Sequence, residues 1–140
     1  MEYEIRLMTI EDYDEVYALW QASEGIGLSA ADNRDGIARF LEHNPGLAFV
    51  ARAGAELAGA VLVGDDGRRG YLHHLAVSAS HRRRGLGRAL VERCLSAMSE
   101  RGIHKCHIFV HASNRSGQAF WEEIGFYPRP ELVLMSYDIL

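Results

Sequence analysis

The sequence predicts an α/β domain in which a mixed sheet carries helices on both faces. Three observations lead to this prediction. The chain contains short apolar runs of β-forming residues, and it contains longer segments whose apolar residues recur at helical spacing. The third observation is their order, because closely spaced strands come before strand–helix–strand units. Closely spaced strands pair as antiparallel hairpins and strand–helix–strand units pair in parallel, so the sheet is expected to be mixed.

The N-terminal half is predicted to hold a strand, two helices and a hairpin. Thr9 and Asp12 make a pattern like a capping box, which opens the first helix. Asn44-Pro45-Gly46 stops the second helix, and three residues that include Gly54 join the two strands of the hairpin. The elements expected here are strand 3–8, helices 10–22 and 31–43, and strands 47–53 and 57–64.

The C-terminal half is predicted to alternate strands and helices. Its long helix has Leu86, Leu90, Cys94 and Met98 at i, i+4 spacing and ends at Gly102. The elements expected here are strand 71–77, helix 85–101, strand 105–111, helix 114–124 and a final strand near 132–138. The complete order is β-α-α-β-β-β-α-β-α-β.

Length and composition narrow the class of protein. A chain of 140 residues with 48% hydrophobic and 24% charged residues fits one globular domain, which we place at 1–140. No apolar run approaches the roughly 20 residues of a membrane span, and the N-terminus lacks the features of a signal peptide, so a cytoplasmic location is expected. A net charge of −4 argues against a nucleic-acid-binding module. The two cysteines form no CxxC pair, and the histidine spacing suggests no metal site.

The stretch HRRRGLGRAL at residues 81–90 indicates an anion site. It comes after a predicted strand and opens the long helix, whose first N–H groups and partial positive charge favour phosphate. Gly85 and Gly87 remove Cβ atoms where phosphate would approach the backbone. The loop also supplies guanidinium groups that match phosphate oxygens, from Arg82, Arg83, Arg84 and Arg88.

Three other anion-binding patterns fit this stretch poorly. A Walker A loop requires Lys and Ser or Thr after the glycines, where Arg88 and Ala89 stand. A Rossmann fingerprint requires Gly or Ala at position 90, which is Leu90. A loop that binds nucleic acid or another polyanion usually interleaves aromatic residues, and this one does not.

The remaining pattern, Arg82-x-x-Gly85-x-Gly87 directly after Leu75-Ala76-Val77, resembles the GNAT superfamily of acyl-CoA-dependent N-acetyltransferases. A second landmark, NRSGQAFWEEIGF at 114–126, resembles the helix that ends in Gly-Phe in this family. The resemblance covers the whole chain. It implies a sheet whose fourth and fifth strands splay apart, and acetyl-CoA bound in the gap between them.

The resemblance also implies roles for particular residues. The pantetheine arm would pair with the backbone of Leu75 and Val77, and the N–H groups of the loop would hold the pyrophosphate. The backbone N–H of Leu75 would stabilise the thioester oxyanion. The residues assigned to the cofactor are Leu75, Ala76, Val77, Arg82, Arg83, Arg84, Gly85, Leu86, Gly87, Arg88, Asn114, Phe120 and Trp121.

Direct attack by an amine requires a base and does not require a nucleophilic cysteine. Strand alternation places His73 on the same face as Leu75, so His73 is the preferred base. His74 would point to the opposite face and is the second candidate. Trp121 stands where many family members have a tyrosine that protonates the leaving thiolate, and an indole cannot supply that proton. Tyr127 is then the candidate acid, unless water serves or the thiolate leaves unassisted.

The acceptor is expected to be a small cationic amine or a protein amino group. Trp20 and Glu24 are the candidate acceptor-side residues, and Asp32 and Asp35 would also attract a cationic amine. A CoA-binding regulatory domain without catalysis is the alternative that the missing tyrosine would permit. We expect a monomer or homodimer that binds no membrane, no nucleic acid and no metal.

Overall fold

The structure is a computed structural model that describes residues 2–140. The chain divides into two compact units, one that extends to Phe109 and a second at Val110–Leu140. The first unit holds the sheet and three of the α-helices, and the second holds the last helix. The prediction of a single domain over 1–140 stays a prediction.

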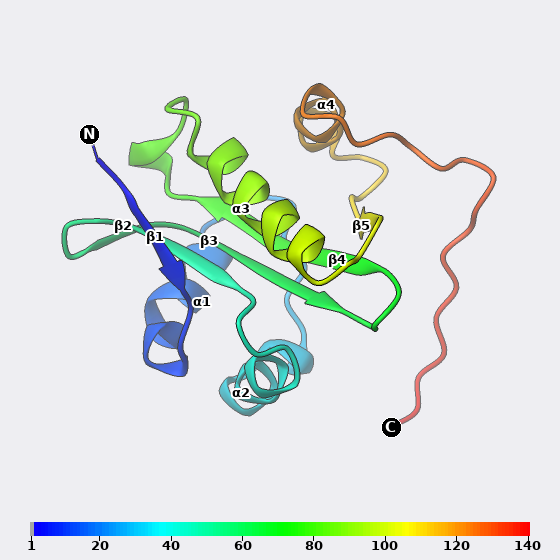
Figure 1. Ribbon diagram of the computed structural model, residues 1–140, viewed down its shortest axis with the longest axis horizontal. Helices are drawn as coiled ribbons and strands as arrows, with labels where there is room; N and C mark the ends of the chain where they lie inside the picture. The colour runs from blue at the N-terminus through cyan, green and yellow to red at the C-terminus, as the bar shows by residue number, and fades with distance from the viewer. Residues whose placement is uncertain (1) are drawn as a thin grey trace. The chain divides into compact units, whose positions relative to one another are not determined.

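The first unit is built on a five-stranded sheet in the order β1-β2-β3-β4-β5 (Figure 1). Neighbours from β1 to β4 pair antiparallel, and β4 and β5 pair in parallel. The mixed sheet is therefore as predicted, because short connections make the hairpins and helix α3 makes the parallel crossover. The strands are β1 (Glu4–Leu7), β2 (Phe49–Ala53), β3 (Glu56–Asp65), β4 (Gly70–Val77) and β5 (Cys106–Ile108).

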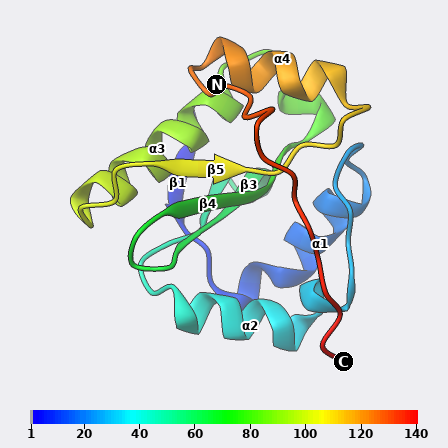
Figure 2. The same ribbon diagram turned by 90° about the vertical axis from the view of Figure 1, so that its right-hand side faces the viewer.

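Helices cover both faces of this sheet, with α3 on one face and α1 and α2 on the other (Figure 2). The α3 face buries Leu86, Leu90, Cys94 and Met98, the stripe that the i, i+4 spacing predicted. A second apolar layer, which includes the fully buried Trp20, lies between the sheet and α1 and α2. The α-helices are α1 (Tyr13–Gln21), α2 (Arg34–His43), α3 (Leu86–Glu100) and α4 (Arg115–Glu123), and the short 3₁₀ helices are η1 (Ile10–Asp12), η2 (Ala30–Asp32) and η3 (Ala79–His81).

A buried carboxylate joins β1, β2 and the start of the first helix. Asp12 accepts hydrogen bonds from Arg6 of β1 and Arg52 of β2, each at 2.8 Å, and from the Thr9 N–H at 2.9 Å. The Thr9 bond is the reciprocal bond of the expected capping box. Burial raises the pKa of Asp12, but these hydrogen bonds outweigh it and lower the pKa to about 2.

The predicted final strand near 132–138 is wrong. Residues 124–140 form no strand, and the large apolar side chains of this segment are exposed, among them Val133, Met135 and Tyr137. Alternating apolar residues make a strand only where a neighbouring strand supplies hydrogen bonds. The unit Val110–Leu140 has α4 and no strand. The element order along residues 2–140 therefore ends at α4.

Candidate active site

The strands β4 and β5 part at a fork. Their parallel pairing ends at Leu72 and Ile108, where β5 stops, while β4 continues to Val77. Beyond Leu72 the β4 backbone therefore has no strand partner in β5. This is the splayed arrangement that the family resemblance implied. A ligand that extends along β4 here would find the edge of the strand open.

A bulge in β4 lies directly beyond this fork. Ala60 of β3 pairs with Ala76, but Leu62 pairs with His73, so two residues of β4, His74 and Leu75, lie opposite the one between them in β3. His74 adopts the left-handed backbone conformation, with φ of +54°. The extra residue shifts the alternation of side chains along the strand.

The bulge overturns the expected distribution of side chains along residues 71–77. The register places His73 on the same face as Ala76, the face of α1 and α2. Val77 pairs with Gly59, which lies against α3 on the opposite face. Strict alternation from His73 through Leu75 would also put Val77 on the face of His73, and this is wrong because the inserted residue breaks the alternation.

His74 also points to the α1 and α2 face, so the expectation that His73 and His74 face opposite sides is wrong for the same reason. The Nε2 atom of His74 lies 2.9 Å from Oδ1 of the buried Asp32. The indole Nε1 of Trp20 donates to the His74 carbonyl at 3.0 Å, and the two rings lie edge to face. His74 is thus held through both its side chain and its backbone.

His73 lies among aromatic rings at the fork. The ring centroids of Tyr71 and Phe109 are 6.4 and 6.1 Å from that of His73, and Phe40 of α2 meets it edge-on. Burial lowers the pKa of His73 below 6.5, and His74 lowers it further, against a smaller opposing effect of Asp32. His73 is therefore neutral at pH 7. Within residues 2–109 no hydrogen bond occupies its ring nitrogens, so a lone pair is available to accept a proton.

The loop that opens α3 has the backbone that the anion-site prediction requires. Gly85 is the N-cap of α3 and adopts φ of +77°, and a Cβ placed on it would meet no atom within 4 Å. The helix begins with the bond from the Ala89 N–H to the Gly85 carbonyl. The N–H groups of residues 86–88 therefore have no acceptor one turn earlier in α3 and face the loop.

Two side chains fix the loop at its entry. The buried His81 lies 2.9 Å from the Tyr3 hydroxyl through Nδ1 and 3.0 Å from Glu56 through Nε2. Arg82 donates from Nε to the Val77 carbonyl at 3.1 Å, which ties the loop to the end of β4. The remaining arginines, Arg83, Arg84 and Arg88, are exposed, and Arg88 Nε lies 3.4 Å from Glu92 within α3.

The predicted cofactor residues of the second unit lie in and beside α4. Asn114 caps this helix by accepting the Gly117 N–H at 2.9 Å. Trp121 packs edge to face against Phe120 and Phe126. Tyr127 is 61% exposed.

The acceptor-side candidates differ in exposure. Glu24 and Asp35 are exposed, whereas Trp20 is fully buried and Asp32 is engaged by His74. Trp20 therefore supports β4 from beneath. The contacts of Asp32 and the ring of Phe109 were missed by sequence reasoning. The S-x-x-D spacing of Ser29 and Asp32 marks a capping box, but nothing in the sequence links Asp32 to a residue 42 positions away.

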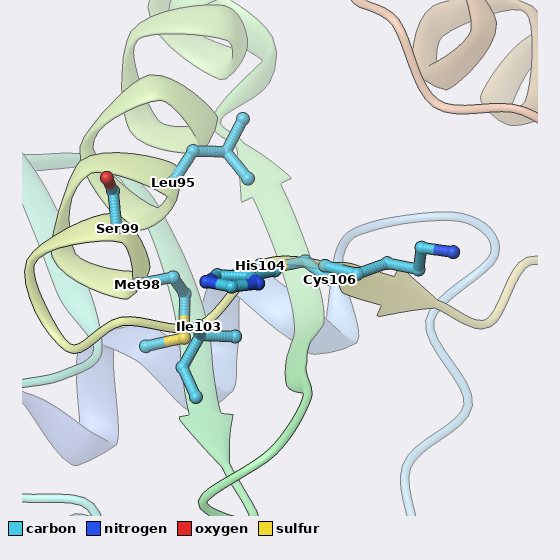
Figure 3. Close-up of a pocket in the computed structure, with 7 residues that line it drawn as sticks. Leu95, Met98, Ser99, Ile103, His104 and Cys106 are labelled. Atoms are coloured by element: carbon cyan, nitrogen blue, oxygen red, sulfur yellow. The ribbon is translucent and has the colours of Figure 1, made fainter.

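Both cysteines fit a structural role, which is the one expected if an amine attacks directly and no nucleophilic thiol is required. Burial raises the pKa of Cys94 to about 12 and also raises the pKa of Cys106. A shallow pocket of about 410 Å³ borders Cys106 between the end of α3 and the start of β5 (Figure 3). It lies at the end of β5 away from the fork, so we assign it no part in the candidate site. No group of three potential metal ligands occurs among residues 2–140, and no helix in that range is long and apolar enough to cross a membrane.

The sequence is similar to a known protein family and to known members of it. Residues 13–126 match the model of the acetyltransferase (GNAT) family. An acetyltransferase of Sodalis glossinidius is 30% identical over 137 residues, which cover 98% of this chain and 96% of that protein.

Solved structures share the fold. Ard1 from Thermoplasma volcanium has a TM-score of 0.81 at 21% identity and covers 91% of this chain and 84% of its own. The PaiA N-acetyltransferase from Thermoplasma acidophilum, solved in complex with coenzyme A, has a TM-score of 0.79 at 20% identity and covers 91% of both chains.

Proposed function

Because the chain belongs to the acetyltransferase (GNAT) family, we propose that it moves an acetyl group from acetyl-CoA to a primary amine by direct attack in a ternary complex. The observation that carries this proposal is the continuity of the fork with the anion loop. The open edge of β4 ends at Val77, and Arg82 of the loop donates a hydrogen bond to the Val77 carbonyl. One extended ligand with a phosphate end and an acyl end would fill both.

The residues present fit acetyl-CoA. The left-handed Gly85 leaves open space beside the first N–H groups of α3, where the pyrophosphate would lie. The exposed side chains of Arg83, Arg84 and Arg88 add positive charge around that position. The unpaired edge of β4 beyond Leu72 would take the pantetheine arm as an added strand.

The chemistry is assigned to groups at the fork. The amine nitrogen bonds to the thioester carbon, and the carbon–sulfur bond breaks as CoA thiolate leaves. His73 takes the proton that the attacking nitrogen loses, because its ring is neutral and holds an available lone pair. The N–H of Leu75 would donate to the thioester oxygen as negative charge develops there. The thiolate, with a free pKa near 8.5, leaves as the anion or takes a proton from water.

The acceptor belongs to one of two classes, a small cationic amine or a protein amino group. The exposed carboxylates of Glu24 and Asp35 favour a cationic acceptor. No observation favours the alternative of a regulatory domain that binds CoA without catalysis.

A thiol-release assay tests the proposal. Acetyl-CoA is incubated with the protein and with a panel of polyamines, amino acids, aminoglycosides and peptides with free N-termini. We expect CoA release that depends on one class of amine. Tight binding of acetyl-CoA without amine-dependent release across the panel would support the regulatory alternative instead.

A further inference from the structure

We propose that the side chain of His74, held by Asp32, latches the bulge of β4 and thereby positions the Leu75 amide for acetyl transfer. This inference rests on the proposed function, because it explains how the proposed oxyanion donor is held. His74 and Asp32 are positioning residues in this role, and His73 remains the proposed base.

The backbone of His74 is in a conformation that its residue type disfavours. With φ of +54°, it lies in the left-handed region, where the Cβ of any residue except glycine crowds the backbone. It does so inside a strand that is otherwise extended. Such a conformation persists only where surrounding contacts over-determine it. The contacts of His74 should therefore explain its left-handed backbone conformation.

Two separate elements hold His74. Asp32 of η2 engages its side chain at 2.9 Å, and Trp20 of α1 donates to its carbonyl at 3.0 Å. Asp32 is itself fixed, because its Oδ2 accepts the Ser29 N–H at 3.0 Å and its carbonyl accepts the Tyr13 hydroxyl at 2.7 Å. Both carboxylate oxygens of Asp32 are thus occupied. This arrangement fits a fixed support better than a site for an incoming ammonium group.

The latch controls the backbone direction of the next residue in the strand. His74 and Leu75 are the two residues that the register leaves unpaired between His73 and Ala76. If His74 relaxed to an extended conformation, the bulge would be lost. The pairing of β4 with β3 beyond that point would then shift by one residue. The Leu75 N–H would then point in another direction. The latch therefore sets the direction of the proposed donor without touching the reacting atoms.

Two substitutions at position 74 separate the backbone role from a chemical role of the imidazole. His74→Gly removes the ring but adopts positive φ readily, so the bulge and the Trp20 bond to the carbonyl should survive. His74→Val is β-branched and resists positive φ. We expect kcat with the amine identified by the panel to fall less than about tenfold in His74→Gly. We expect it to fall about 10²–10³-fold in His74→Val, the usual effect of losing an oxyanion donor.

A matched pair at position 32 tests the same latch from its other side. Asp32→Asn keeps one oxygen that can accept from His74 Nε2 but turns its NH2 toward the Ser29 N–H, so its kcat should fall less than that of Asp32→Ala. Asp32→Ala removes the acceptor, so its kcat should fall as in His74→Val. Calorimetric affinity for CoA should be unchanged in His74→Gly and Asp32→Asn, which keep the bulge. It should weaken in His74→Val and Asp32→Ala, because the shifted backbone of Leu75 and Val77 is also the proposed partner of the pantetheine arm. An equal loss in His74→Gly and His74→Val would show that the imidazole itself acts, and it would overturn the proposal.

A second readout needs no acceptor. Hydrogen exchange of the Trp20 indole N–H, measured by NMR, reports whether the His74 carbonyl stays in place. We expect exchange to be slow in the wild type, His74→Gly and Asp32→Asn, and faster in His74→Val and Asp32→Ala. Equal exchange in all five proteins would overturn the latch. If the wild type acetylates no amine but this exchange pattern holds, the proposed function fails while the latch stands as the cause of the bulge.

Discussion

His73 and Phe109 are the first residues beyond the last paired positions of β4 and β5, and their ring centroids lie 6.1 Å apart. The fork is therefore bordered by an imidazole and an aromatic ring. Tyr71 and Phe40 complete the ring cluster around His73. This cluster removes water from His73 and keeps it neutral, which is the state that a general base needs.

Replacement of His73 tests its role as the base. His73→Ala should lower kcat/KM by about 10²–10⁴, the usual effect of removing a positioned base. His73→Phe should lose as much activity while it preserves the packing against Phe40 and Phe109. The loss should shrink as pH approaches the pKa of the acceptor amine, because more acceptor then arrives neutral. Wild-type turnover in both variants between about pH 6 and pH 9 would remove His73 from the mechanism.

The pH dependence of the wild-type enzyme has a predicted direction. Because burial lowers the pKa of His73 below 6.5, the neutral base predominates above that pH. The limb of kcat/KM that reports His73 should therefore rise with pH and have its midpoint below pH 6.5. Steady-state rates in overlapping buffers measure it. A His73-dependent limb centred above pH 7 would contradict the burial of this ring.

The role of Gly85 can be separated from its effect on stability. Gly85→Val should abolish acetyl-CoA binding, because the side chain would fill the space beside the N–H groups of α3. Gly54→Val is the matched control, since Gly54 has φ of +62° and equally open surroundings in the β2–β3 turn. Both should lose about 1–2 kcal/mol of stability. Calorimetry should show lost affinity only in Gly85→Val, and unchanged affinity there would refute the loop assignment.

The anion loop contains a second strained position. Arg83 is exposed and adopts φ of +62°. Arg83→Gly should raise the free energy of unfolding by about 0.5–1 kcal/mol, because relief of the strain exceeds the added freedom of the unfolded chain. Arg83→Ala removes the same charge and keeps the Cβ, so it should give no gain. Urea denaturation of both variants decides between them, and equal stability would mean that the backbone at this position carries no strain.

The buried Asp12 should make stability depend on pH in acid. Its pKa of about 2 in the folded protein lies below the ordinary 3.8, so its contribution is complete above pH 3.8 and is lost as pH falls toward 2. The contribution is about 2 kcal/mol. Asp12→Asn should remove it and flatten the acid limb of urea midpoints. Glu15→Gln, at an exposed partner of the same Arg52, should change that limb less.

The sequence predicts the order of the elements well where periodicity is strong. The i, i+4 stripe of α3, the hairpins and the glycine-rich start of α3 are all present. The loop could be identified because its requirements, absent Cβ atoms and a helix N-terminus, are local properties. Properties that depend only on neighbouring residues can be predicted from the sequence.

The errors share a different cause. The bulge at His74 depends on contacts with Trp20 and Asp32, which lie 54 and 42 positions away, so alternation alone put both histidines on the wrong relative faces. The segment 132–138 has a strand-like pattern, but pairing depends on a partner strand that the pattern does not reveal. Both failures concern tertiary contacts that override a local period.

The most direct test of acetyl transfer to an amine traces the acetyl group itself. The protein is incubated with acetyl-CoA that carries an isotopically labelled acetyl group, with and without the responding amine, and the masses of amine and intact protein are measured together. We predict labelled acetyl on the amine nitrogen and none on the protein in either reaction. Label retained on a protein side chain such as Cys106, or bound acetyl-CoA that never labels any amine, would contradict direct transfer.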